Sequence, residues 1–183
     1  DNNPLARVDP TGLDSYLYVI QGDKGNSNIG YRWMGTHSMM AIQIPDGRYL
    51  SASWEGQWTL KLGVNPQDLS KIYKEGADVF ALRAKTTGEQ ERDMLKRLAL
   101  SVGKSPKGLI RELENSSEGT NTYNIEGHGY NVIWDNCTTR LWDLLGYAGY
   151  GGYKNIVPSP NSLFDLRIKQ IGQTTPVWFD VKK

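Results

Sequence analysis

Two apolar, β-prone segments on either side of a tight-turn sequence constrain the fold of this chain more than any other feature. The first runs from His37 to Ile44 and the second from Arg48 to Trp54, with Pro45-Asp46-Gly47 between them. Short apolar runs separated by Pro, Asp and Gly are typical of a β-hairpin. The chain is therefore predicted to contain antiparallel strands, and His37 is predicted to begin one of them.

The rest of the sequence predicts a mixed order of strands and helices. Further strands are expected at 16–20, 78–84 and 130–134. Helices are expected at 66–76, 87–103, after Cys137 and at 159–168, and the clearest of them opens with a capping box of Thr87 and Gln90. Two segments rich in Gly and polar or Tyr residues, 104–129 and 146–153, are predicted to be loops, and the first is interpreted as a long loop or a lid near a functional site.

Cys137 is the only cysteine, and the sequence from Trp134 to Trp142 is typical of a strand that leads directly into a helix. A thiol at a helix N-terminus faces unpaired N–H groups and the positive end of the helix dipole, which lower its pKa from about 8.5. Asp135 and Asn136 are N-cap residue types, and the apolar helix face begins only after the cysteine. This placement favours a nucleophile over the alternative, an inert cysteine buried in the core.

A cysteine nucleophile needs a base, and the chain has two histidines. His37 begins a strand, where a rigid scaffold can hold an imidazole toward a helix terminus. His128 lies between glycines in an expected loop, so His37 is the preferred base. On the strand that follows the turn, alternation places Ser51 and Glu55 on one face as candidates for a third member. The sequence does not separate these two, and either could instead be a polar residue on a solvated face.

The order of these motifs resembles the circularly permuted branch of the NlpC-type papain-like superfamily. The resemblance spans about residues 30–168 and rests on Gly35-Thr36-His37-Ser38, on Tyr49-Leu50-Ser51 and on the segment from Tyr130 to Thr139. It implies an α+β, papain-like fold, with an antiparallel sheet packed against helices that include the nucleophile helix. It also implies a thiol hydrolase without a cofactor, with Cys137 as nucleophile and His37 as base. Relatives often carry His, Glu or Gln as the third member, where this chain offers Ser51 or Glu55.

The N-terminus carries a second resemblance. The segment from Asn2 to Leu13, with Asn-Pro-Leu followed by Asp-Pro-Thr-Gly-Leu, is similar to the junction that closes the Rhs repeat core. By that resemblance residues 1–13 are the tail of the Rhs core with its cleavage junction, and residues 14–183 are a papain-like toxin domain. Such a toxin is delivered by contact-dependent secretion into a target bacterium, here expected to act in the cytoplasm. A cognate immunity protein is the expected partner.

Together the two resemblances predict an interbacterial effector that cleaves a protein through a Cys–His acyl-enzyme mechanism. Three alternatives stay open: a peptidoglycan amidase or endopeptidase in the target periplasm, a lipid acyltransferase or deacylase, and a non-enzymatic binding module on the same fold. Trp54 and Tyr150, together with Asn136 beside the cysteine, are candidate substrate contacts. Aromatic rings supply a large contact area, although ordinary core packing is the alternative role.

Composition excludes several other functions. The chain has 21 basic and 20 acidic residues, and this balance argues against nucleic acid as a partner. Two histidines and one cysteine without ligand spacing make a poor metal site, so no metal is expected. No apolar run approaches the roughly 18 residues of a membrane span, so stable membrane insertion is not expected either.

Overall fold

An antiparallel sheet with helices on one of its faces is the framework of the protein. The computed structural model describes residues 13–21, 37–66, 78–125, 136–147 and 177–178. Within them the strands are β1 Leu13–Gln21, β2 His37–Gln43, β3 Tyr49–Trp54, β4 Trp58–Leu62, β5 Asp78–Thr86, β6 Thr120–Tyr123 and β7 Val177–Trp178. They form one sheet in the order β6-β4-β3-β2-β1-β5-β7.

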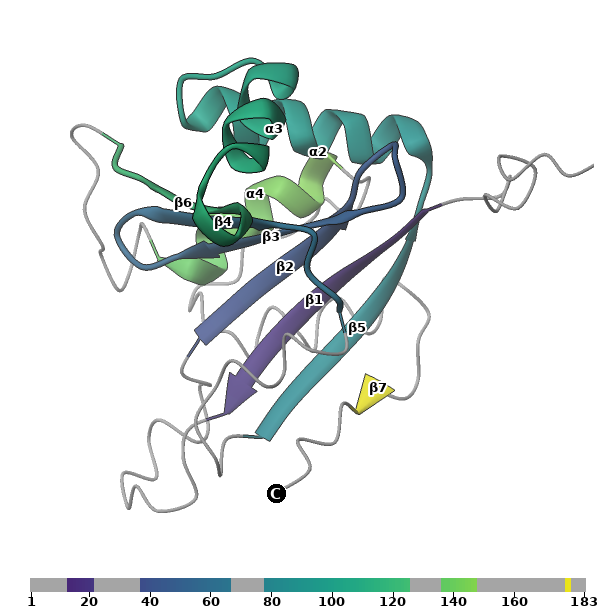
Figure 1. Ribbon diagram of the computed structural model, residues 1–183. Helices are drawn as coiled ribbons and strands as arrows, with labels where there is room; N and C mark the ends of the chain where they lie inside the picture. Colours follow the sequence, from purple (N-terminus) through teal and green to yellow (C-terminus); the bar gives the residue numbers. More distant parts are fainter. Residues whose placement is uncertain (1–12, 22–36, 67–77, 126–135, 148–176, 179–183) are drawn as a thin grey trace, which may run out of the picture.

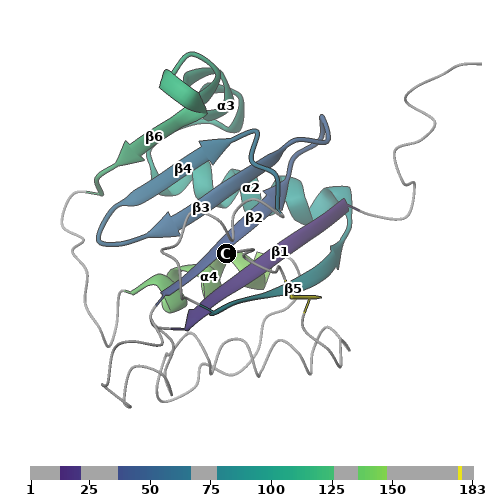
Figure 2. The same ribbon diagram turned by 60° about the horizontal axis from the view of Figure 1, so that its bottom comes forward.

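Three helices lie on the same side of this sheet, as Figures 1 and 2 show from two directions. They are α2 Gly88–Ser101, α3 Pro106–Glu114 and α4 Cys137–Leu145. Helix α4 packs mainly on β2, α2 on β1 and β2, and α3 on β4. The fold is therefore α+β, with an antiparallel sheet packed against helices.

The predicted hairpin is confirmed as β2 and β3. Its turn is closed by two backbone bonds: the N–H of Gly47 donates to the carbonyl of Ile44 at 2.8 Å, and the N–H of Ile44 donates to the carbonyl of Arg48 at 2.8 Å. Gly47 has a φ of 87°, a conformation that side chains disfavour. Because this turn fixes the pairing of Met39 with Ser53, it decides which β3 side chains approach the start of β2.

The capping box predicted for the helix after Thr87 is also confirmed. The N–H of Gln90 donates to Thr87 Oγ1 at 3.2 Å, and the N–H of Thr87 donates to Gln90 Oε1 at 2.8 Å. The expected strands at 16–20 and 78–84 lie within β1 and β5. The expected domain boundary after Leu13 falls inside β1, where Leu13 pairs with Thr86 of β5.

The predicted loop or lid at 104–129 was wrong over most of its length. This segment contains α3, a single 3₁₀ turn at Ser117–Gly119, and β6. Ser105 is the N-cap of α3, with its hydroxyl accepting a hydrogen bond from the N–H of Gly108 at 3.1 Å, and Pro106 follows at the first turn. Leu109 and Leu113, four residues apart, bury one face of α3 in the core. The Gly and charged residues around these two leucines concealed this short amphipathic pattern.

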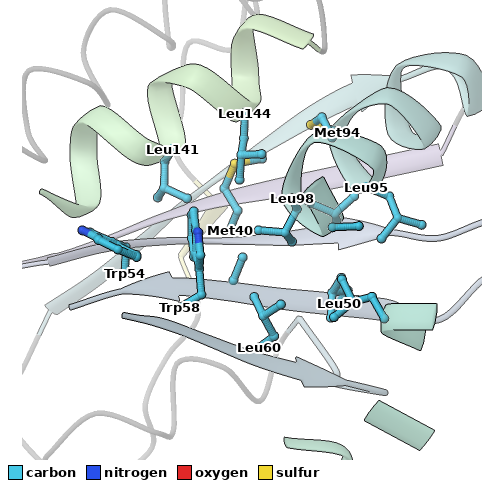
Figure 3. Packing of buried hydrophobic residues seen from close by; sticks show 14 of the residues in the cluster. Met40, Leu50, Trp54, Trp58, Leu60, Met94, Leu95, Leu98, Leu141 and Leu144 are labelled. Carbon is cyan, nitrogen blue, oxygen red and sulfur yellow. The ribbon is translucent and has the colours of Figure 1, made fainter. Parts of the chain in front are cut away.

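The core lies between the sheet and the helices. Alternate residues of the central strands face the helices, among them Met40 of β2 and Leu60 of β4. Figure 3 shows these side chains together with Leu50, Trp54, Trp58, Met94, Leu95, Leu98, Leu141 and Leu144. This packing holds α4, and therefore Cys137, in a fixed position over the start of the hairpin.

Several predicted elements lie outside the described residues: the strand at 130–134, the helices over 67–76 and 159–168, and the loop over 148–153. Strand β4 was not predicted from the sequence. No helix within the described residues has the length and apolar character needed to cross a membrane.

Candidate active site

Helix α4 begins at Cys137 because the residue before it is a strong cap. The N–H of Thr139 donates to Asn136 Oδ1 at 3.0 Å, and the N–H of Asn136 donates to Thr139 Oγ1 at 2.9 Å. This reciprocal pair is a capping box, and it makes Cys137 the first residue of the helix. Asn136 is 3% exposed. Through Oδ1 its side chain caps the helix, which gives Asn136 a role in positioning α4. The substrate contact expected from the sequence stays a prediction.

The N-terminus of α4 also presents backbone donors beside the thiol. The N–H groups of Thr139 and Arg140 are bonded to Asn136. Those of Cys137 and Thr138 have no acceptor in the part of the chain that the structure describes. Unpaired N–H groups in the first turn favour a negative charge close to them.

The structure brings His37 and Cys137 together, although they lie one hundred positions apart in the sequence. Burial raises the pKa of the Cys137 thiol, but hydrogen bonding from the His37 side chain and its charge lower it. The hydroxyl and backbone of Ser38 lower it further, and the resulting pKa is about 7, below the ordinary 9.0. A large fraction of the thiol is therefore ionised at neutral pH.

Side chains at the end of β3 and just after it also contact the imidazole of His37. His37 Nε2 lies 2.8 Å from Ser53 Oγ and 3.7 Å from Glu55 Oε1. Ser51, the expected third member, instead donates its hydroxyl to the carbonyl of Lys61 at 3.4 Å. The register explains the difference, because Ser53 pairs with Met39, two residues from His37, whereas Ser51 pairs with Ala41. Sequence alternation gave the correct face of β3, and Glu55 stays a candidate beside Ser53.

Trp54 lies in the core and has no exposed surface. Its ring meets the ring of Trp58 edge-on at 5.4 Å between centroids, and the guanidinium of Arg140 lies 4.5 Å from its centre. In this arrangement Trp54 offers nothing to a substrate and links α4 to β3, so the expected substrate contact is corrected. Tyr150, the remaining expected substrate contact, lies outside the described residues, and so does His128, the histidine not preferred as the base.

Both reactive side chains are shielded. Cys137 is 1% exposed and His37 is 9% exposed. A reaction at the sulfur therefore requires that a substrate or probe gain access to it. Within the described residues, no group of three His, Cys, Asp or Glu side chains is placed to hold a metal ion.

The chain was compared with models of known protein families, with curated proteins and with solved structures. None of the three comparisons found a match to it.

Proposed function

We propose that the protein is a papain-like cysteine hydrolase that cleaves a protein inside a target bacterium. The observation that carries this proposal is the pairing of Cys137, at the start of α4, with the His37 side chain, which lowers the pKa of the thiol to about 7. An inert core cysteine has neither an imidazole partner nor a depressed pKa. The role as an interbacterial toxin is supported by the Rhs-like segment at residues 2–13.

The chemistry follows from these two groups. The Cys137 thiolate attacks a carbonyl carbon, so that a carbon–sulfur bond forms and the carbonyl electron pair moves onto oxygen. When this intermediate collapses, the carbon–nitrogen bond breaks and the amine leaves with a proton from His37. Water then attacks the thioester, passes a proton to His37, and releases the acid and the thiolate.

Two parts of the surroundings support this cycle. The N–H groups of Cys137 and Thr138 are suited to stabilise the oxyanion, and removing one such donor typically costs about 3 kcal/mol of the barrier reduction. Ser53 and Glu55 act on the opposite side as positioning residues. By engaging Nε2 of His37, they leave Nδ1 as the nitrogen that exchanges a proton with the sulfur.

The test is to map new protein N-termini in bacteria that express the wild-type chain or the Cys137→Ala variant. We expect toxicity and a specific set of new N-termini with the wild type and neither with the variant. Lys107→Ala, an exposed change on α3, serves as the matched control and should behave as the wild type. Equal toxicity of wild type and Cys137→Ala would overturn the hydrolase proposal.

A second arm distinguishes the site of action. The same three proteins are expressed with an export signal that directs them to the periplasm. Toxicity that requires export would favour a peptidoglycan amidase or endopeptidase. Toxicity without export supports a cytoplasmic protein substrate.

A further inference from the structure

Ser38 lies beside His37 at the start of β2, but its side chain faces the other way. Alternation along the strand places Ser38 on the face of Met40 and Ile42, which packs against the helices. Helix α4 packs mainly on β2. Ser38 therefore lies between the hairpin and the N-terminal part of the helix that carries Cys137.

The Ser38 hydroxyl is completely buried. Ser38 is 0% exposed, and its Oγ makes no hydrogen bond of standard geometry within the part of the chain that the structure describes. Buried hydroxyls in proteins almost always have a partner, so a hydroxyl without one calls for an explanation. Its proton is free to turn toward a charge that develops nearby.

The nearby group that can develop a charge is the sulfur of Cys137. The side chain and the backbone of Ser38 both lower the pKa of this thiol, in addition to the larger contribution of His37. A second hydroxyl, Thr138 Oγ1, lies 4.0 Å from the sulfur and is the rival donor. The two candidate donors are thus Ser38, which follows His37 in the sequence, and Thr138, which follows Cys137.

We propose that the Ser38 hydroxyl donates a hydrogen bond to the Cys137 thiolate and holds the sulfur in its ionised form beside His37. This inference rests on the proposed function, because it assigns a role within the same site. The bond is strongest while the sulfur is charged, because a thiolate accepts a hydrogen bond more strongly than a neutral thiol does. When the sulfur forms the thioester, its charge is lost and the bond weakens.

The test is the titration of the Cys137 thiolate, followed by its ultraviolet absorbance. Each protein is compared with the same protein carrying Cys137→Ala, so that tyrosine absorbance cancels. We expect a midpoint near pH 7 for the wild type and a midpoint roughly one pH unit higher for Ser38→Ala. Ser38→Thr, which keeps the hydroxyl, should restore the lower midpoint. An unchanged midpoint in Ser38→Ala would overturn the assignment.

Two further sets of variants address misfolding of Ser38→Ala and the rival donor Thr138. If Ser38→Ala does not fold, the nearly isosteric pair Ser38→Thr and Ser38→Val isolates the hydroxyl, and equal midpoints in this pair would reject the proposal. Thr138→Val tests the rival donor. A larger shift for Thr138→Val than for Ser38→Ala would transfer the role to Thr138 and overturn the proposal.

The titration needs no substrate, so it separates the two proposals. A raised midpoint in Ser38→Ala supports the hydrogen bond even if the wild-type protein cleaves nothing, an outcome that would overturn the hydrolase function alone. An active wild type with an unchanged midpoint in Ser38→Ala overturns the Ser38 assignment alone.

Discussion

His37 and Ser53 lie diagonally across the β2–β3 pair, with His37 Nε2 at 2.8 Å from Ser53 Oγ. This contact joins the proposed base, on β2, to the neighbouring strand β3. Because the His37 side chain also hydrogen-bonds to the Cys137 thiol, its contact with Ser53 helps to set how the ring is oriented toward the sulfur. The hairpin thus supplies the proposed base and also the group that positions it.

Ser53→Ala should therefore reduce turnover by about tenfold, the effect of losing one hydrogen bond of roughly 1–1.5 kcal/mol. The effect is expected in kcat and not in KM, because Ser53 acts through His37. The measurement is steady-state cleavage of a peptide that spans a site found by N-terminus mapping. Ser53→Thr should recover most of the activity.

Ser51→Ala is the matched control for this experiment. Ser51 is a buried serine on the same strand, and its hydroxyl bonds to the carbonyl of Lys61. Its loss should leave kcat within about twofold of the wild type, an effect of less than 0.5 kcal/mol. A larger loss of kcat in Ser51→Ala than in Ser53→Ala would mean that the observed register does not describe the active form.

The reactivity of Cys137 should depend on pH through its ionisation. Because the thiolate is the nucleophile, the rate of alkylation by iodoacetamide in the native protein should rise with pH, with a midpoint near 7. In His37→Ala the midpoint should move upward toward the ordinary 9.0, because the hydrogen bond and charge of His37 that lower the pKa are removed. If native Cys137 stays unmodified from pH 6 to 9 and reacts only after unfolding, the sulfur is an inert core atom.

The same ionisation should make stability depend on pH. The pKa of Cys137 is about 7 in the folded protein, below the ordinary 9.0, so between these values the unfolded chain holds a proton that the folded chain has released. The free energy of unfolding of the wild type relative to Cys137→Ala should therefore increase from pH 7 to 9 and be lost as the pH falls through 7. Urea unfolding at pH 6, 7, 8 and 9 measures the difference. A constant difference would contradict the lowered pKa.

Arg140 should stabilise the junction between α4 and the hairpin. Its guanidinium lies 4.5 Å from the centre of the buried Trp54 ring, and a cation–π contact of this kind is worth about 1–2 kcal/mol when desolvated. Arg140→Met should therefore lower the free energy of unfolding in urea by about that amount. Arg111→Met, an exposed change on α3, should alter it by less than about 0.5 kcal/mol.

Leu113 distinguishes a core helix from a mobile lid. It is completely buried on α3, so Leu113→Ala should destabilise the protein by about 2–5 kcal/mol. The exposed Lys107→Ala on the same helix should have little effect. Thermal unfolding followed by circular dichroism measures both changes. If Leu113→Ala and Lys107→Ala both change the stability only slightly, the segment is a lid and not a part of the core.

The sequence predicted those parts of the fold that are determined by a few consecutive residues. The turn at 45–47 and the capping box of Thr87 and Gln90 each lie within a few consecutive residues, and both predictions were confirmed. Strand β4 and helix α3 were missed because each is short, with five and nine residues, so each offers only a brief stretch of apolar periodicity. Ser105 followed by Pro106 was the available signal for α3.

The residues of the candidate site also fall into those that the sequence could predict and those that it could not. His37 and Cys137 could be singled out because each begins an element, and ends of elements are where side chains from distant segments meet. The sequence left the choice between Ser51 and Glu55 open and did not single out Ser53, because alternation predicts a face while the position along the strand depends on register. Ser38 carried no signal at all, since its significance comes from burial against a helix one hundred residues away.

The cap formed by Asn136 and Thr139 has a consequence for how this protein can vary. An α-helix turns about 100° per residue, so one extra residue between the cap and the cysteine would keep the helix but rotate the sulfur a quarter-turn or more from the imidazole. Insertions elsewhere leave that angle untouched. In related sequences that keep this site, Cys137 should therefore directly follow its N-cap residue Asn136.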